Sequence, residues 1–299
     1  MFRRPFSSSF RDLSGKKIFV TGAASGIGRS CALLAASEGA SVFLTDRNTD
    51  ELAATAAEIR ASGGSVPFTE AVDISDYPAV AALATRLTAA HGAMDVVMNV
   101  AGISSWGTVQ SLEHDQWRKL VDVNLMGPIH VIEELIPPMI ESGRPGHLVN
   151  VSSAAGIIGM PWHAAYSASK FGLRGVSEVL RFDLRRHRIG VSLVCPGGVD
   201  TGLTETIDIA GVDKSTPSFE RAHAHFRKRA VSPDVAASAI LDGVRRNKYW
   251  VYTSNDIRFI HFLQRHCSPA YVVAMRVMNA GANKALPAVG RARRTGGTA

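Results

Sequence analysis

Cysteine is scarce in this 299-residue chain, and the three cysteines that occur are scattered. Cys31, Cys195 and Cys267 form no C-x-x-C pair, which argues against a disulfide framework and a thiolate metal site. We therefore expect free thiols in a cytoplasmic protein. The sequence also lacks an H-E-x-x-H motif, and the spacing of His223 and His225 does not place both rings on one helix face, so we expect no metal.

Long uninterrupted apolar runs are absent as well. The most apolar late stretch, residues 257 to 278, is broken by Arg258, Arg265 and Pro269, so we expect no transmembrane span. The first residues, "MFRRPFSSSF", carry arginines, but the apolar run of about 7 to 15 residues that a secretory signal needs does not follow them. We expect a soluble protein.

Acidic residues are rare in the last part of the chain. From residue 221 onward there are 14 Lys and Arg against 3 Asp and Glu, whereas the whole chain has a net charge of +7. A basic segment of this kind can meet nucleic acid or an anionic membrane surface. No nucleic-acid motif accompanies the charge, so we expect no nucleic-acid partner and favour a solvated surface.

Short apolar runs rich in β-branched residues alternate along the chain with stretches of helical periodicity. The runs lie near residues 17, 41, 66, 94, 147, 190 and 248, and segments such as "DELAATAAEIRASGG" between them have helical spacing. Strands that alternate with helices are typical of a parallel sheet covered on both faces. We predict a single-domain, doubly wound α/β fold of the Rossmann type, with a mostly parallel seven-stranded sheet.

The boundaries of the helices and of the domain follow from the same pattern. Asn48 or Thr49 can cap the helix after the second strand, and Gly63 and Gly64 can end it. We expect the catalytic domain to span residues 14–255, with a substrate lid at about 202–230. Residues 1–13 and 287–299 are expected to be frayed, and residues 256–299 to form a helical extension with a basic tail.

A glycine-rich loop joins the first strand to the first helical pattern. It reads "TGAASGIG" and contains Gly22, Gly26 and Gly28. Glycines permit a tight turn and a close approach of the backbone to a ligand, and the N–H groups of the following helix favour a pyrophosphate. The order of strand, glycine loop and helix therefore predicts a dinucleotide site.

Tyr166 and Lys170 are four positions apart in "YSASK". On a helix this spacing places both side chains on one face, so the ammonium can lie near the phenol. A positive charge favours the phenolate and lowers the pKa of a tyrosine from its usual value near 10. The pair can therefore act as a general acid and base, although the same spacing occurs on solvated helix faces.

These motifs together resemble the classical short-chain dehydrogenase/reductase family. The loop at 21 to 28 matches the family's T-G-x-x-x-G-x-G, and "NVAG" at 99 to 102 is similar to its N-N-A-G, with Val100 in place of the second asparagine. "PGGVDT" at 196 to 201 resembles the segment that closes over the nicotinamide. The resemblance extends over about residues 14 to 202.

The resemblance implies a catalytic tetrad of Asn124, Ser153, Tyr166 and Lys170. Ser153 precedes Tyr166 by thirteen positions, and this family spacing selects it over the neighbouring Ser152. Ser153 is then expected to hydrogen-bond the substrate oxygen and Tyr166 to transfer the proton. Lys170 is expected to bind the nicotinamide ribose and lower the pKa of the phenol, and Asn124 to hold a water that links Lys170 to solvent.

The resemblance also implies a pyridine nucleotide. Asp46 ends the second strand, where a carboxylate can accept hydrogen bonds from the ribose 2′-OH and repel a 2′-phosphate, which favours NAD. Arg47 could pair with a 2′-phosphate, so NADP stays open as the alternative. The residues expected to bind the nucleotide are Thr21, Gly22, Ser25, Gly26, Ile27, Gly28, Asp46, Arg47, Asp73, Ile74, Asn99, Ala101, Gly102, Tyr166, Lys170, Pro196, Gly197, Val199 and Thr201.

The substrate is expected to contact Ser153 and Tyr166, together with Trp106, Met160 and Trp162 beside them. This aromatic and aliphatic wall suggests a bulky, apolar secondary alcohol or its ketone, although buried aromatic residues also commonly fill cores. We expect an NAD(P)-dependent oxidoreductase that interconverts the two by hydride transfer.

The C-terminal extension has apolar positions at helical spacing with basic residues between them. We expect it to cover the substrate site or to form an interface in a homodimer or homotetramer, and peripheral membrane contact is the alternative. Two other functions stay open. One is a nucleotide-binding regulator without turnover, and the other is a membrane-surface reductase of a lipid-like carbonyl that uses NADPH.

Overall fold

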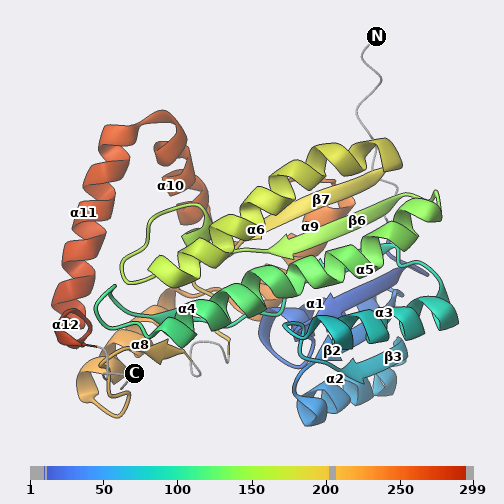
Figure 1. Ribbon diagram of the computed structural model, residues 1–299, viewed down its shortest axis with the longest axis horizontal. Helices are drawn as coiled ribbons and strands as arrows, with labels where there is room; N and C mark the ends of the chain where they lie inside the picture. The colour runs from blue at the N-terminus through green and yellow to red at the C-terminus, as the bar shows by residue number, and fades with distance from the viewer. Residues whose placement is uncertain (1–9, 11, 202–206, 294–299) are drawn as a thin grey trace.

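A seven-stranded sheet forms the centre of the protein (Figure 1). The computed structural model describes residues 10, 12–201 and 207–293. The strand order is β3-β2-β1-β4-β6-β7-β9, and every neighbouring pair is parallel. The predicted fold class is therefore confirmed. The strands are β1 (Lys17–Thr21), β2 (Ser41–Asp46), β3 (Ser65–Ala71), β4 (Val96–Asn99), β6 (Gly146–Val151), β7 (Ile189–Cys195) and β9 (Trp250–Tyr252).

Helices cover both faces of this sheet. One buried cluster joins the strands to α1, α2 and α9, and a second joins them to α3 and α5, beside which α6 runs. Strand order reverses between β1 and β4, which is where parallel sheets of this kind open a crevice for ligands. The helices are α1 (Gly26–Ser37), α2 (Thr49–Ala61), α3 (Tyr77–His91), α4 (His114–Val121), α5 (Gly127–Glu141), α6 (Ala164–Asp183), α8 (Pro217–Arg229) and α9 (Pro233–Arg245).

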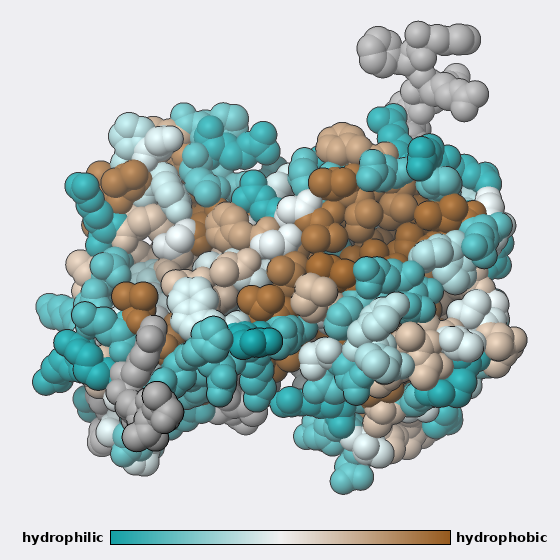
Figure 2. All heavy atoms as spheres, in the orientation of Figure 1, coloured by the Kyte–Doolittle hydropathy of each residue, from teal (hydrophilic) through white to brown (hydrophobic). Residues whose placement is uncertain are grey.

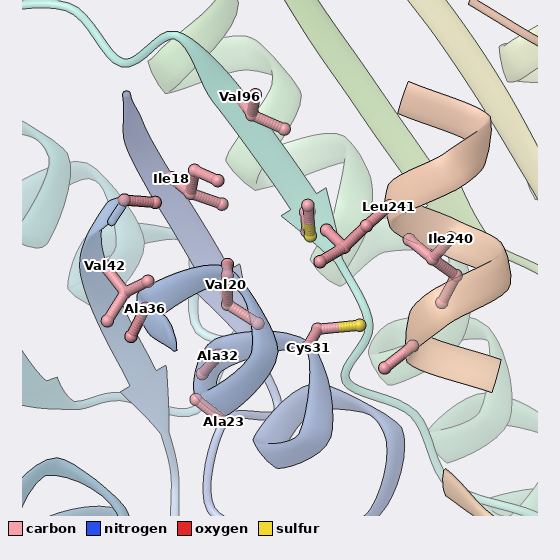
Figure 3. Close-up of a cluster of buried hydrophobic side chains, with 14 of the residues drawn as sticks. Ile18, Val20, Ala23, Cys31, Ala32, Ala36, Val42, Val96, Ile240 and Leu241 are labelled. Carbon is pink, nitrogen blue, oxygen red and sulfur yellow. The ribbon is translucent and has the colours of Figure 1, made fainter. Parts of the chain in front are cut away.

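The core between β1 and the α1–α9 pair explains why this part of the sequence has so few polar residues (Figure 3). Ile18 and Val20 of β1 point toward Cys31 on α1 and toward Ile240 and Leu241 on α9, and all five are buried. Burial of this Cys31 thiol raises its pKa to about 12, so the side chain behaves as a small apolar residue.

The ends of α2 follow the local rules of helix capping. The Asn48 side chain accepts a hydrogen bond from the backbone N–H of Glu51 at 3.2 Å, so Asn48, rather than Thr49, is the cap. After the last helical residue, Gly63 takes a φ of +81°, a left-handed conformation that a glycine adopts without a steric penalty. Both ends lie where the sequence predicted them.

Among the described residues, packing extends into both segments that the sequence predicted to be frayed, 1–13 and 287–299. Phe10 and Leu13 are buried, and the Phe10 ring meets the His147 ring edge-on at 6.4 Å. At the other end, residues 287–291 form the short helix α12, in which Val289 is fully buried. A few apolar side chains within these polar segments bury enough surface to hold the neighbouring backbone against the core. The polar composition of the segments does not reveal this.

The described part of the C-terminal extension, up to residue 293, forms three helices, α10 (Asn255–His266), α11 (Ser268–Ala285) and α12 (Pro287–Arg291). Figure 1 shows α10 and α11 as a hairpin beside the sheet end, with α12 returning toward α8. Tyr271 and Met275 on α11 pack against the core. Within the part of the chain that the structure describes, no helix is long and apolar enough to span a membrane.

His147 should make the fold sensitive to acid. Burial in β6 lowers the pKa of this ring from 6.5 to about 3, and its Nε2 lies 2.8 Å from the Ser192 hydroxyl. Because the unfolded chain binds the proton first as the pH falls, the free energy of unfolding should drop by about 2 kcal/mol between pH 7 and pH 5 from this residue. Urea unfolding at both pH values measures the drop, and His147→Gln should reduce it. An equal drop in both proteins would contradict this role of His147.

Candidate active site

The glycine loop lies where β1, β4 and α1 approach one another. The Thr21 hydroxyl at the end of β1 accepts hydrogen bonds from the N–H groups of Val100 and Ala101 at 3.0 and 3.1 Å. A Cβ on Gly22, whose φ is +71°, would lie 2.8 Å from the Ala101 backbone. A Cβ on Gly28 would lie 2.0 Å from the carbonyl oxygen of Gly22. No larger residue fits at either position, so the loop needs these glycines to keep α1 close to β1.

The first turn of α1 is open to an anion. Ser25 is the N-cap residue, and its side chain makes no capping hydrogen bond to the helix. Gly26 follows with a φ of +52°, and Ile27 turns its side chain toward the core. Backbone N–H groups at a helix N-terminus carry partial positive charge, so this turn fits the pyrophosphate of a dinucleotide.

Asp46 is held beside this loop at the carboxyl end of β2. Its carboxylate accepts backbone hydrogen bonds from Ala24 at 3.1 Å and from Asn48 at 3.0 Å. Arg47 follows it and is exposed. These two hydrogen bonds hold the carboxylate at the end of β2, where the sequence predicts a contact with the ribose 2′-OH of a nucleotide.

Asp73 and Ile74 occupy the corresponding end of β3. Partial burial raises the pKa of the Asp73 carboxyl, but hydrogen bonds from Ser75 outweigh it and keep the pKa below its usual value, with the positive charge of Arg47 contributing. Ile74 is a core residue, because its side chain fills the space where a Cβ of Gly127 would lie. Ile74 therefore holds the backbone at this end of β3, while Asp73 carries the carboxylate that is expected to contact the nucleotide.

Asn99 belongs to a buried chain of polar side chains that crosses the sheet to α6. Its amide donates to the Asn150 carbonyl at 2.9 Å, and the Asn150 amide donates to the Ser177 hydroxyl at 2.9 Å. Val100 replaces the family's second asparagine. It donates its backbone N–H to the Thr21 hydroxyl and contributes no side chain to this polar network, so the network is intact without the second asparagine. Sequence reasoning missed Asn150 and Ser177, which have no motif of their own.

Asn124 lies in a π-helix, Asp122–Met126, between α4 and α5. Its side chain is fully buried, accepts from the Ile103 N–H at 2.8 Å and donates to the Ile103 carbonyl at 2.9 Å. The amide also reaches the Ser169 hydroxyl at 3.2 Å. A π-turn inside a helix often marks a functional position, because it displaces one residue from the regular helix surface. No pattern in the sequence predicts this turn.

Tyr166, Lys170 and Ser153 come together as the sequence predicted. The first two lie on α6 and are buried, with the Lys170 ammonium 5.8 Å from the centre of the phenol ring. Ser153 follows β6, and its hydroxyl hydrogen-bonds the Tyr166 side chain. The neighbouring Ser152 hydroxyl instead donates to the Lys170 carbonyl at 3.0 Å, so it is turned away from the phenol.

The electrostatics of this group differ from the expectation. Burial raises the pKa of Tyr166, and the hydrogen bond with Ser153, rather than the charge of Lys170, opposes the rise. Burial also lowers the pKa of Lys170 from 10.5 to about 8, and its ammonium donates to the Val151 carbonyl at 3.0 Å. The free-energy cost of burying a phenolate therefore outweighs its stabilisation by the Lys170 ammonium, which is itself poorly solvated.

Gly102 lies between the lysine and the π-helix. A Cβ there would be 3.0 Å from the Asn124 side-chain oxygen and 3.3 Å from the Lys170 ammonium. The absence of a side chain leaves room for a ligand group to approach both residues. With Ala101 in contact with Gly22, this segment joins the glycine loop to the tetrad.

The segment after β7 connects the neighbourhood of Ser153 to the glycine loop. The Pro196 carbonyl accepts from the N–H of Ala154 at 2.7 Å, next to Ser153, and the N–H of Gly197 donates to Thr253 at 3.3 Å. Val199 forms a bridge to Val231. At its far end, the Thr201 side chain would lie 3.1 Å from a Cβ on Gly26. Of the expected lid, residues 202–206 lie outside the described residues.

Of the three side chains expected to bind substrate beside Ser153 and Tyr166, the structure brings Met160 and Trp106 near the phenol, whereas Trp162 packs in a neighbouring cluster around Ile209 and Val289. Met160 packs in the same cluster as the phenol. The Trp106 ring lies 4.5 Å from the His163 ring, which in turn meets the Tyr166 ring edge-on at 5.9 Å. Burial lowers the pKa of His163 to about 4, so this ring is neutral and apolar in character at neutral pH.

Trp162 has a strained backbone and a partner in the C-terminal extension. Its φ is +63°, which is unusual for a bulky residue, and its indole N–H donates to Asn283 on α11 at 3.2 Å. On the same loop, the N–H of Gly159 donates to the Tyr271 hydroxyl at 2.9 Å. The extension therefore anchors the loop that carries the substrate wall, a role of Tyr271 and Asn283 that the sequence did not predict.

Comparison with known proteins agrees with this geometry. The family model described as short chain dehydrogenase matches residues 16–210. The oxidoreductase SadH of Mycobacterium tuberculosis is 34% identical over 279 residues, which cover 91% of this chain and 97% of SadH. The 3beta-hydroxysteroid dehydrogenase of Mediterraneibacter gnavus is 41% identical over 64% of this chain and 68% of its own.

A solved structure shows the same fold with a nucleotide. The short chain dehydrogenase/reductase of Burkholderia phymatum, in complex with NAD, has a TM-score of 0.75 and 29% identity, and the match covers 85% of this chain and 94% of that one. With the family model matching well over half of the chain, this protein belongs to the short-chain dehydrogenase/reductase family and is an NAD(P)-dependent oxidoreductase of CH–OH and C=O groups.

Proposed function

We propose that this protein interconverts a bulky, apolar secondary alcohol and its ketone, with Tyr166 as the general acid and base. The observation that carries the proposal is the buried contact of Tyr166 with Ser153 and Lys170, bordered on one side by Gly102 and on the other by aromatic rings. A proton-transfer group beside a nucleotide crevice and an apolar wall fits this reaction.

Each residue of the expected tetrad has its own role in the proposed reaction. The nicotinamide, when bound, accepts or donates the hydride and in its oxidised form brings a positive charge to the site. Ser153 holds the substrate oxygen within reach of the Tyr166 hydroxyl, which takes the proton of an alcohol or returns one to a ketone. Lys170 contributes a second cation, since its ammonium lies 5.8 Å from the centre of the phenol ring. Asn124 orients the chain around Ile103 beside them.

We also propose that NAD is preferred over NADP, because backbone hydrogen bonds hold the Asp46 carboxylate at the end of β2, where the sequence predicts a contact with the ribose 2′-OH. Asp46→Ala should raise the KM for NAD⁺ by about tenfold and lower the KM for NADP⁺, since it removes both an acceptor and a repulsive charge. Steady-state rates with each nucleotide measure the change. Asp50→Ala, which removes a carboxylate from the exposed first turn of α2, is the matched control. A wild type that prefers NADP⁺ would contradict this role of Asp46 and point to Arg47.

The apolar substrate class rests on His163 and Met160, which pack beside the phenol, and on Trp106, which packs against His163. The 3beta-hydroxysteroid dehydrogenase among the relatives supports a rigid, apolar alcohol as the first compound to test. We expect NAD⁺-dependent oxidation of a 3β-hydroxysteroid with a kcat/KM at least about tenfold above that for cyclohexanol, followed by NADH absorbance. Binding of nucleotide without turnover of any alcohol would instead favour a regulator.

We further propose that the chain forms a homodimer or homotetramer through α5 and α6. Phe171, Val179 and Phe182 on α6 are exposed, and Figure 2 shows apolar side chains gathered on the face that these helices present. An exposed apolar patch of this kind is typical of a protein interface. Light scattering should give a multiple of the 31.9 kDa chain mass, and Val179→Glu should reduce it. A monomeric wild type would contradict the proposal.

A further inference from the structure

An apolar hollow lies beside the candidate active site, at the end of the sheet where the chain's C-terminal part returns. It encloses about 450 Å³ of space, including its open mouth. Its floor is a two-stranded parallel sheet, β5 (Ser105–Trp106) paired with β8 (Asp208–Ile209). Its walls are Phe219 and Phe226 on α8 and Leu286 at the start of α12. Figure 1 shows α8 and α12 next to each other at this end of the molecule.

The hollow is connected to the catalytic tyrosine through aromatic rings. Trp106 lines the hollow and contacts His163, and His163 contacts Tyr166. A rigid, apolar molecule whose reacting carbon lies at Tyr166 and Ser153 can therefore continue along the Trp106 ring into the hollow. Its far end would then be surrounded by apolar side chains.

One polar atom in this apolar lining has no partner. The His223 ring lies parallel to the Phe219 ring, with 5.6 Å between their centres, and it lines the hollow. Its Nε2 atom is buried and makes no hydrogen bond with any residue that the structure describes. A buried nitrogen without a partner is costly, and a ligand that supplies the missing hydrogen bond removes that cost.

The hollow is closed by parts of the chain outside the family match. The matched residues end at 210, whereas His223 lies on α8 and Leu286 precedes α12. α12 is fixed by Val289, which is fully buried against the residues around β8. The hydrogen bond from Trp162 to Asn283 ties the same region to the substrate wall. The walls of the hollow are thus built by α8 and by the start of α12, both of which follow the matched residues.

We infer that this hollow binds the far end of the substrate, and that His223 selects a molecule with a second oxygen at the end remote from the reacting carbon. The inference rests on the proposed function, since it uses Tyr166 to place the reacting end. The substrate class is then an elongated apolar alcohol or ketone with oxygen atoms at both ends. His223 recognises the far oxygen and takes no part in proton or hydride transfer.

A pair of 3β-hydroxysteroids, with and without a ketone on the ring farthest from the hydroxyl, tests the inference. We expect the wild type to prefer the compound with the ketone by about tenfold to a hundredfold in kcat/KM, mainly through KM. His223→Phe keeps an aromatic ring against Phe219 but removes the nitrogen, so the ratio of the two kcat/KM values should fall to near one. His266→Phe, at an exposed histidine on α10, is the matched control and should keep the ratio. A ratio that His223→Phe leaves unchanged would overturn the role of His223.

A second variant tests the hollow itself. Leu286→Trp places a larger side chain in the wall, so kcat/KM should fall at least about tenfold for both steroids relative to cyclohexanol, which is too small to reach the hollow. Equal effects on steroids and cyclohexanol would overturn the location. Cyclohexanol also separates the two proposals, because a wild type that oxidises cyclohexanol but neither steroid retains the proposed chemistry and contradicts the hollow. Turnover of no alcohol, together with failure of either steroid to quench tryptophan fluorescence, would contradict both.

Discussion

Replacing Tyr166 by phenylalanine should lower kcat by about a hundredfold to ten-thousandfold, with little change in nucleotide affinity. The substitution removes only the hydroxyl that hydrogen-bonds Ser153, and the ring keeps its contacts with His163 and the Lys170 ammonium. Because burial raises the pKa of this phenol, the wild-type side chain is neutral at pH 7, so the substitution leaves the charge of the site unchanged. Steady-state rates with the best secondary alcohol and NADH titration measure the two effects.

Tyr77→Phe is the matched control for this change. Tyr77 is exposed on α3, donates its hydroxyl hydrogen to Glu134 at 2.8 Å, and is not among the residues expected to bind nucleotide or substrate. It should keep the wild-type kcat. If Tyr166→Phe retained more than about a tenth of the wild-type rate, the assignment of the proton to this residue would be wrong.

Lys170→Met should separate activity from stability. We expect kcat/KM to fall at least about a hundredfold, since the variant lacks the cation beside Tyr166 and the group that faces Gly102. The free energy of unfolding should nevertheless rise by about 2 to 3 kcal/mol at pH 7, because the lysine is fully buried and burial lowers its pKa from 10.5 to about 8. The lost hydrogen bond to the Val151 carbonyl offsets part of this gain.

The free energy of unfolding of the wild type should depend on pH through Lys170. The folded chain releases the Lys170 proton at lower pH than the unfolded chain does, so wild-type stability rises as the pH increases from about 8 toward 10.5. The stability advantage of the variant should shrink over the same range. Urea unfolding of both proteins at pH 7 and at a pH above the lysine's folded pKa measures this. Lys284→Met, on the exposed side of α11, should change neither quantity, and a Lys170→Met variant less stable than wild type at pH 7 would contradict the account.

The glycine loop and the strands could be predicted because their causes are local. A glycine is required at position 28 because a Cβ there would overlap the Gly22 carbonyl. Asn48 caps α2 by accepting a hydrogen bond from Glu51, only three residues away. The strands were visible as apolar runs because a parallel sheet is buried on both faces. The pairing of Ser153 with Tyr166 was accessible through family spacing, although its distance along the chain gives no physical clue.

Other features depend on contacts between distant parts of the chain. The π-helix at Asn124 is held by Ile103, and the loop around Trp162 is anchored by Asn283, 121 positions later. No pattern within either segment reveals its partner. The balance of charges at Tyr166 was also inaccessible, because the cost of burial depends on the packed site and outweighs the pairing that the i, i+4 spacing suggested. These features shape the expected substrate wall, so the sequence alone predicts the class of reaction more closely than the substrate.

Titration of the wild-type protein with NADH and with NADPH, followed by tryptophan fluorescence, tests the central claim most directly. Saturable quenching by NADH at lower concentrations than by NADPH is the predicted result. Gly28→Val should abolish it, because the added side chain would overlap the Gly22 carbonyl. If neither nucleotide bound the wild type, the glycine loop would not be a dinucleotide site, and the assignment of Tyr166 as the partner of a hydride transfer would fail with it.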